Sequence, residues 1–334
     1  MTKTKDEKSQ ERKNRAMEAL KHLFCGGVAG SAAKTVTAPL SRLTILYQVH
    51  SMVTTKENRP KFAMSFGDGM KKIVDRGGVL SLWKGNGTSV LHRFPFSAIN
   101  FYVYENVLDA LNGIQRPWEG DEDERSLPDA TFSRFIAGSL AGSTACIACY
   151  PLDLIRTRIT TELPGNERYK GIIDAFTKTL QTEGFAGLYS GLGPTLLVAV
   201  PNFAISYTIY GTLKEYALDD DLFYNMRRVD EEGEKRLGFR LTLMCGAASG
   251  SLSTLITFPF DTIRRRMQIQ GIHFAPHERL SGRQQIKNLF QNEGLRGIYR
   301  GLTPELLKVV PMVGTMFMVY EFLKDQLNIK DKKR

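Results

Sequence analysis

The chain has 334 residues, with 45 lysines and arginines against 35 acidic residues and a formal net charge of +10 at pH 7. This balance suits an anionic partner, whether nucleic acid, anionic lipid or a small anion. Four cysteines without a second Cys-x-x-Cys pair or a histidine cluster argue against a disulfide framework and a metal site. Residues 1–17 form a polar tail that lacks the apolar core of a secretory signal.

Apolar residues are gathered into long uncharged stretches. Phe135–Leu152, Gly191–Leu213 and Leu241–Phe260 contain no charged residue. Uncharged stretches of about 18 residues or more predict membrane-spanning helices. A soluble helical-repeat protein is the alternative, but long uncharged helices with glycines four residues apart favour packing in lipid.

The first of three similar segments covers residues 18–112. It opens with small residues at Gly26–Gly30, and we expect Pro39 to end or kink this helix before a charged turn. A short amphipathic helix is predicted at about 66–76. An aromatic, a cation and a glycine follow at Trp83-Lys84-Gly85, which suits an interface that binds phospholipid phosphate. A second apolar helix is predicted near 88–111.

The same order recurs at 130–217 and 238–327. Pro151 and Pro259 take the place of Pro39, which gives a repeat of about 110 residues. Short helices are predicted at 172–182 and 281–292, and closing apolar helices near 193–216 and 303–326. Hydrophilic linkers at 115–129 and 219–235 join the segments. The pattern therefore predicts six apolar helices in three pairs.

Together these features resemble the mitochondrial carrier family. Its odd-numbered helices carry Pro-x-Asp/Glu-x-x-Lys/Arg, and its even-numbered helices carry Phe/Tyr-Asp/Glu-x-x-Lys/Arg. The resemblance implies an all-α membrane protein of six transmembrane helices in three repeats of about 100 residues. These would form a pseudo-threefold barrel with three short matrix helices. It also implies alternating access in the mitochondrial inner membrane, with both termini facing the intermembrane space.

The resemblance assigns the proline motifs to a gate on the matrix side. Asp153 of the second repeat is expected to pair with Arg264 of the third. Arg156 and Asp261 meet no opposite charge, because the first repeat has a serine and a threonine there. Two glutamines match the family's bracing positions. The predicted matrix gate comprises Ser41, Thr44, Gln48, Asp153, Arg156, Asp261, Arg264 and Gln268.

A second gate is expected on the cytoplasmic side. Glu105 can pair with Lys214, whereas Gly211 and Leu108 leave Lys324 and Glu321 without partners. Exposed ion pairs contribute little, so such a gate can open. The alternative is that these charges only lie at membrane ends. The predicted cytoplasmic gate comprises Tyr104, Glu105, Tyr210, Lys214, Tyr320, Glu321 and Lys324.

Some charges inside the apolar helices occur in one repeat only. Ionisable residues within a membrane helix are energetically unfavourable and usually functional. A charge absent from the other repeats is not needed for symmetric gating, so it suits contact with an asymmetric substrate. Basic side chains bind phosphate, and small apolar ones leave room for a flat base. By resemblance, the substrate-binding residues are Lys34, His92, Arg93, Val198, Ala199, Asn202 and Lys308.

Two details of this assignment stay open. His92 and Arg93 are neighbours about 100° apart on a helix, so only one can point squarely inward. His92 is otherwise a packed neutral histidine. Arg265 and Arg266, which follow Arg264, are either part of a family-like arginine-methionine motif or a basic collar at the matrix side.

The nearest resemblance is to coenzyme A and adenine-nucleotide carriers of the plant-like kind. No Asp-x-Asp-x-Asp-Gly loop precedes the repeats, so we expect a form without calcium regulation. We therefore predict exchange of phosphorylated anions, not an enzyme, with no cofactor and no metal. Expected partners are the anionic substrate and membrane lipid such as cardiolipin, with no nucleic acid, in a monomer. Alternatives are a carrier of smaller anions, namely phosphorylated glycolytic intermediates or carboxylates, and a non-transporting scaffold.

Overall fold

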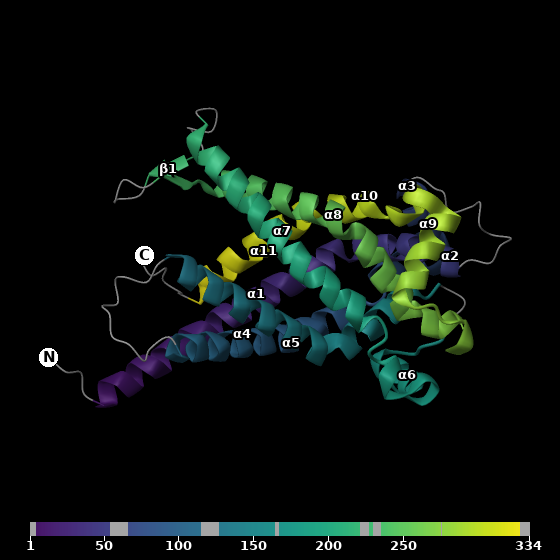
Figure 1. Cartoon of the computed structure of the whole chain (residues 1–334), viewed down its shortest axis with the longest axis horizontal. Coiled ribbons are helices and arrows are strands. Elements are labelled where there is room, and N and C mark those ends of the chain that lie inside the picture. Colours follow the sequence, from purple (N-terminus) through teal and green to yellow (C-terminus); the bar gives the residue numbers. More distant parts are fainter. Residues whose placement is uncertain are drawn as a thin grey trace. The chain divides into compact units, whose positions relative to one another are not determined.

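The computed structural model describes residues 5–53, 66–114, 127–163, 167–220, 227–229, 235–274 and 276–327. Within these residues the fold is helical apart from one short hairpin (Figure 1). Strands β1 (Arg227–Val229) and β2 (Lys235–Leu237) pair antiparallel, with Arg228 opposite Arg236. The helical fold class is as predicted. The hairpin, in the region of the second linker, was not predicted.

Three long helices carry the proline motifs: α1 (Lys5–Gln48), α5 (Leu127–Thr161) and α8 (Phe239–His273). Pro39, Pro151 and Pro259 lie inside them, so the prediction of a charged turn after each proline is wrong. An internal proline removes one hydrogen bond, and here the surrounding helix tolerates that loss. Helix α1 also begins at Lys5, and it includes most of the segment predicted as a polar tail.

Three short helices follow at the predicted places: α3 (Phe66–Gly77), α6 (Ile172–Gly187) and α9 (Gly282–Ile298). Helix α9 begins with a capping box between Ser281 and Gln284. Gly184 and Gly294 have φ values of 69° and 62° and interrupt the helical geometry near the ends of α6 and α9. Positive φ is a conformation that glycine adopts without steric cost, so these glycines mark where the amphipathic part stops.

The closing helices are α4 (Asn86–Ile114) and α7 (Leu192–Asp219), with α10 (Leu302–Leu307) and α11 (Val309–Gln326) in the third repeat. The break between α10 and α11 falls at Lys308. Pro311 lies four residues after Leu307 and has no N–H to offer its carbonyl. Short helices connect the longer ones: α2 (His50–Val53) and the 3₁₀ helices η2 (Val79–Trp83) and η4 (Pro276–Glu278).

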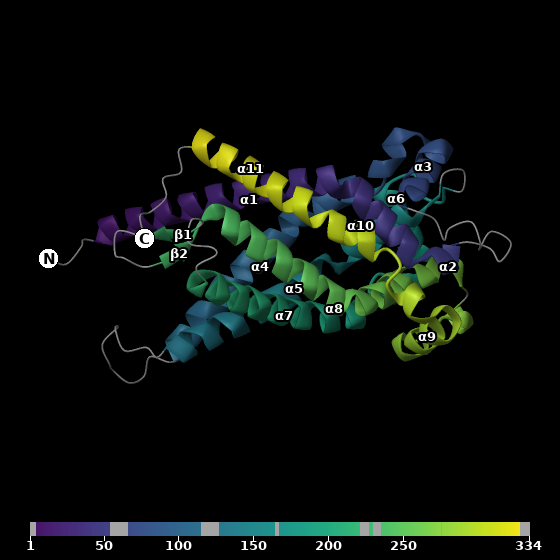
Figure 2. The same cartoon turned by 90° about the horizontal axis from the view of Figure 1, so that it is seen from above.

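The chain divides into two compact units. The first comprises Met1–Val36, Ser89–Ala145 and Pro311–Arg334, and the second comprises Thr37–Thr88 and Cys146–Val310. Within the second unit α7 packs along α8, as both views show (Figures 1 and 2), and also contacts β2. This unit holds the three proline motifs and all three short amphipathic helices.

Each repeat forms a small apolar core in the second unit, where the helix after the proline meets its amphipathic helix. In the first repeat this core contains Leu43, Leu46, Tyr47, Ile73 and Leu82. In the second it contains Tyr150, Leu154, Ile155, Ile159 and Ala175. In the third it contains Ile263, Leu289 and Ile298. Burial of these side chains is the main force that fixes each amphipathic helix in place.

One segment is long and apolar enough to cross a membrane, among the residues whose side chains are described. It is Leu302–Gln326, with a mean hydropathy of 1.6 over its most apolar window, and little of that window is buried. An apolar helical segment of this length and composition, even with its break at Lys308, is suited to lipid contact.

Candidate functional site

The three repeats meet through a repeated glycine contact in the second unit. Gly85, Gly191 and Gly301 each have positive φ and start the closing helix of their repeat. A Cβ on the first would contact Thr160 of the second repeat, and a Cβ on the second would lie 3.3 Å from Met267 of the third. A Cβ on the third would lie 2.9 Å from the carbonyl of Thr44 in the first repeat. The contacts run from one to two, two to three and three to one, so they close a ring.

An arginine supports each of these three joints. Its side chain donates a hydrogen bond to a backbone carbonyl of the next repeat in the same cyclic order. The bonds are Arg42 Nη2 to Glu162 O (2.8 Å), Arg158 Nε to Gln268 O (3.2 Å) and Arg266 Nε to Gln48 O (3.0 Å). Hydrogen bonds from charged donors are among the stronger ones, so these arginines stabilise the ring.

The predicted ion pair of the matrix gate is present. Arg264 Nη2 lies 2.5 Å from Asp153 Oδ2. Gln268 Nε2 donates to the same oxygen at 2.9 Å, and Arg265 Nη1 lies 3.7 Å from it. Arg265 also donates to Thr157 Oγ1. Asp153 is therefore the shared acceptor of a cation-rich cluster, and Gln268 occupies the bracing position that the sequence predicted.

Two other members of the predicted gate, Arg156 and Asp261, face no opposite charge from the first repeat. Among the described residues, no carboxylate lies within 4.0 Å of the Arg156 side-chain nitrogens, which matches the presence of Ser41 in the first repeat. Asp261 Oδ1 lies 3.8 Å from Arg264 of its own helix. Arg264 is thus the cation nearest to both aspartates, while Arg156 adds positive charge without a paired acid.

The first repeat contributes no charge to this cluster. Thr44 donates its hydroxyl hydrogen to Leu40 O of its own helix at 3.1 Å. Gln48 is buried, and its Oε1 has no hydrogen-bond partner among the described residues. Its backbone carbonyl accepts from Arg266 instead. Gln48 therefore does not brace an ion pair in the way that Gln268 does.

Two buried ion pairs were not predicted from the sequence. Arg158 is fully buried and binds both carboxylate oxygens of Glu183, at 2.5 and 2.9 Å. Arg266 binds both oxygens of Glu293, at 2.7 and 2.9 Å. Each pair holds the helix after the proline to its amphipathic helix. Arg266 is thus a buried residue that joins two helices of the third repeat.

A signal for these pairs exists in the sequence. In the second and third repeats an arginine stands seven residues after the proline, and a glutamate precedes the glycine that ends the amphipathic helix. The first repeat has Leu46 and Gly77 at these two positions, so it has lost both partners together. Leu46 packs in the apolar core beside Ile73 instead.

The cytoplasmic gate residues are divided between the two units. Tyr104, Glu105, Tyr320, Glu321 and Lys324 belong to the first unit, and Tyr210 and Lys214 belong to the second. The pairing of Glu105 with Lys214 therefore stays a prediction. Lys324 Nζ lies 3.8 Å from Glu321 Oε2 on the same helix, so the expectation that neither has a partner is wrong. Residues three apart share a helix face, which brings these two together.

The structure distinguishes His92 from Arg93 within the first unit. The Arg93 guanidinium packs against Gly30 of α1, where a Cβ would lie 2.8 Å from Arg93 Nε. His92 stacks on Phe96, with ring centroids 5.4 Å apart. Lys34 lies one turn after Gly30 on α1. Arg93 is therefore the member of the pair that points toward the helix bearing Lys34.

The remaining predicted substrate residues lie in the second unit. Val198 is buried on α7, with Ala199 and Asn202 half-buried beside it. Lys308 lies at the break between α10 and α11, where its Nζ is 2.5 Å from Glu305 Oε1. Glu305 was not among the predicted site residues. It is the partner that the structure adds to this set.

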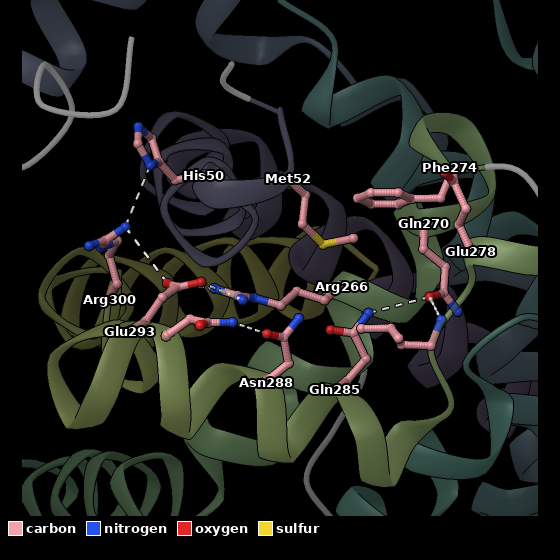
Figure 3. Close-up of a pocket in the computed structure, with 12 residues that line it drawn as sticks. His50, Met52, Arg266, Gln270, Phe274, Glu278, Gln285, Asn288, Glu293 and Arg300 are labelled. Carbon is pink, nitrogen blue, oxygen red and sulfur yellow. Dashed lines mark hydrogen bonds and ion pairs between the residues drawn. The ribbon is translucent and has the colours of Figure 1, made fainter. Parts of the chain in front are cut away.

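A pocket of about 460 Å³ lies elsewhere in the second unit, between α2, α8 and α9 (Figure 3). None of the predicted substrate residues lines it. The close-up shows a continuous chain of contacts from His50 through Arg300 and Glu293 to Arg266. Burial, with the Arg300 charge beside it, lowers the pKa of His50 to about 4. The residues that line the pocket thus contact one another, and these contacts join the first repeat to the third.

Comparison with known proteins agrees with this threefold organisation. The family model described as "Mitochondrial carrier protein" matches three segments, residues 15–115, 128–221 and 235–331. "Mitochondrial adenyl nucleotide antiporter SLC25A24" of Homo sapiens is 35% identical over 313 residues, covering 93% of this chain and 59% of that protein. "Probable mitochondrial adenine nucleotide transporter BTL3" of Arabidopsis thaliana is 34% identical over 323 residues, covering 94% of this chain and 70% of that protein.

The chain thus spans about three fifths of the length of the animal relatives that it matches. The matched segments nevertheless cover most of this chain, and they coincide with the order of elements described above. The resemblance seen in the sequence is confirmed: the chain belongs to the mitochondrial carrier family.

Proposed function

We propose that this protein exchanges phosphorylated anionic metabolites, adenine nucleotides or coenzyme A, across the mitochondrial inner membrane. It is a multi-pass carrier whose six helices form a pseudo-threefold barrel and work by alternating access, with both termini in the intermembrane space. The closed ring of three inter-repeat joints, with the Asp153–Arg264 pair at its gate, is the observation that carries this proposal. A gate closed by a single full ion pair is weakly held, which suits a protein that must open and close.

The nature of the substrate follows from the residues that break the threefold symmetry. Lys34, Arg93 and Lys308 supply positive charge for phosphate oxygens, and an arginine can bind two of them at once. Val198 and Ala199 form a small apolar wall for a flat base, with Asn202 as a hydrogen-bonding neighbour. The printed names of the relatives, an adenyl nucleotide antiporter and an adenine nucleotide transporter, support the same class.

The partners follow from the same features. The substrate is a small anion, no bond is broken, and the carrier acts as a monomer. The glycine N-caps at Gly85, Gly191 and Gly301 present backbone N–H groups at helix starts, which suits the phosphates of a lipid such as cardiolipin. Proton or metal chemistry is not required of any residue in this scheme.

Ligand-induced thermal stabilisation of the purified protein in detergent tests the proposal. A ligand that binds the folded state raises the melting temperature by mass action. Coenzyme A, ADP and ATP should each raise it, and malate and phosphoenolpyruvate should not. Stabilisation by malate or phosphoenolpyruvate with no response to any adenine compound would contradict the proposed substrate class and favour a carrier of smaller anions.

A further inference from the structure

Lys308, which we expect to bind substrate phosphate, already forms an ion pair with a carboxylate of the same protein. Lys308 Nζ lies 2.5 Å from Glu305 Oε1, and the two side chains are only 20% and 16% exposed. An ion pair this sheltered is screened less than one on an open surface. A phosphate oxygen that approached Lys308 would therefore compete with the Glu305 carboxylate.

This acid and this base occur together in only one repeat. The closing helices start at Gly85, Gly191 and Gly301. The residues four and seven positions after each glycine are therefore equivalent in the three repeats. They are Ser89 and His92, Thr195 and Val198, and Glu305 and Lys308. The ring of joints is threefold, but this pair is not. Glu305 is therefore not needed for the shared architecture, and its presence goes with that of Lys308.

A second cation is within electrostatic reach of Glu305. Arg156 experiences the charges of Arg265, Asp153, Arg264 and Glu305. No carboxylate among the described residues lies within 4.0 Å of the Arg156 side-chain nitrogens. Glu305 thus interacts electrostatically with Arg156 as well as with Lys308.

We propose that Glu305 is an affinity-setting residue of the substrate site: an internal counter-anion that occupies Lys308 in the empty carrier and that substrate phosphate must displace. This inference rests on the proposed function, since it assumes that Lys308 binds substrate. The displacement weakens the binding of every anion that uses Lys308 by the same factor. The ratio of affinities among these anions is unchanged, but an anion with few other contacts falls below a useful affinity, whereas a polyphosphate with several further contacts still binds.

The alternative role for Glu305 is local. An acid in the first turn of a helix is stabilised by the helix dipole, and an ion pair three residues apart supports the helix. This role would affect stability without changing substrate affinity. The two roles are distinguished by measuring KM and melting temperature on the same variants.

The test is exchange of labelled ADP in proteoliposomes by Glu305→Gln. We expect KM for ADP to fall about fivefold, which corresponds to about 1 kcal/mol. The empty variant should melt at a lower temperature than the wild type, because Lys308 loses its counter-charge, and ADP should raise its melting temperature by more. Glu305→Thr, which installs the second repeat's residue, should behave in the same way and provides a second variant if the first is poorly expressed.

Two controls isolate the effect. Adding Glu305→Gln to Lys308→Gln should not change the melting-temperature shift given by ADP beyond that of Lys308→Gln alone, a readout that does not depend on transport. Asp174→Asn, which breaks the local ion pair with Lys178 on α6, should leave KM unchanged. An unchanged or raised KM in both Glu305 variants would overturn the inference while leaving the proposed function intact. Absence of ADP exchange by the wild type would instead contradict the proposed function.

Discussion

At the residue scale, the residues of the proposed matrix gate concentrate positive charge around one acceptor. Asp153 is buried and interacts with Arg264, Arg265 and Gln268. Arg156 also acts on it electrostatically, and within the described part of the chain no carboxylate lies within 4.0 Å of the Arg156 side-chain nitrogens. Removing one partner of a buried pair leaves the other charge uncompensated, and that is more damaging than loss of the attraction itself. Asp153 should therefore matter more for stability than any other acid in the gate.

We predict that Asp153→Asn destabilises the protein by about 3 kcal/mol, the range found when a buried pair loses one member. Asp261→Asn is the matched control, because its carboxylate also neighbours Arg264 but at 3.8 Å. It should cost less than about 1 kcal/mol. Thermal unfolding of both variants in detergent measures the difference. Equal melting temperatures for the two would show that Asp153 is not the central acceptor.

His50 gives a pH prediction at the same scale. Its folded-state pKa is about 4, lowered by burial and by Arg300, Lys72 and Arg266, with Glu293 acting in the opposite direction. The unfolded chain takes up this proton near pH 6.5. The contribution of neutral His50 is thus fully present above about pH 6.5 and is lost as the pH falls toward 4.

His50→Gln should remove this part of the pH dependence. The loss of melting temperature between about pH 7 and about pH 5 should be smaller in the variant than in the wild type, because glutamine cannot take up a proton. Parallel pH profiles for the two proteins would show that His50 does not contribute. The comparison is independent of transport, since His50 lies outside the predicted substrate residues.

Contacts of single residues were predictable where the three repeats could be aligned with one another. The Asp153–Arg264 pair follows from two motif positions in adjacent repeats, so alignment of the copies is enough to find it. Glu305 and the Arg93–Gly30 contact do not follow in this way. They depend on which side of a helix a residue faces and on the break at Lys308, which pattern alone does not fix.

At the element scale, the amphipathic helices are held by different forces in different repeats. In the second and third repeats a buried arginine binds a glutamate near the end of the helix. In the first repeat Leu46 and Gly77 replace that pair, and α3 is held by apolar packing. A hydrophobic replacement of a buried ion pair is often as stable as the pair, which explains why the first repeat can lose both partners.

The pair between α5 and α6 should be essential for their attachment. Glu183→Gln leaves the fully buried Arg158 without its carboxylate and should destabilise the protein by about 3 kcal/mol. Asp174→Asn on the same helix breaks an exposed pair and should cost under about 1 kcal/mol. Limited proteolysis around 162–172, together with melting temperature, measures both variants. Similar sensitivity in the two variants would contradict the structural role of the buried pair.

Element order was predictable and some element ends were not. Amphipathic periodicity and the glycines that follow it, Gly78, Gly184 and Gly294, placed α3, α6 and α9 closely. The prolines misled, because Pro39, Pro151 and Pro259 were expected to end or kink their helices before a charged turn, and the helices continue through them. Whether a helix passes through a proline depends on the packing around the lost hydrogen bond, and that information is not local in the sequence.

At the scale of the whole molecule, threefold repetition and its exceptions have separate roles. The glycine contacts and arginine hydrogen bonds repeat in cyclic order and build the ring. The charges that we assign to substrate do not repeat. Length and periodicity predicted six apolar helices in three pairs. The barrel itself is inferred from family membership, because helix periodicity does not say which helices become neighbours.

The most direct test of this account is uptake of labelled ATP into liposomes that contain the purified protein and internal ADP. We predict saturable uptake that requires internal nucleotide and is abolished by Lys308→Ala, a variant that should still be folded and unfold in one cooperative thermal transition in detergent. Absence of nucleotide uptake, together with robust exchange of malate by the same preparation, would contradict the central claim that this carrier transports adenine-containing phosphorylated anions.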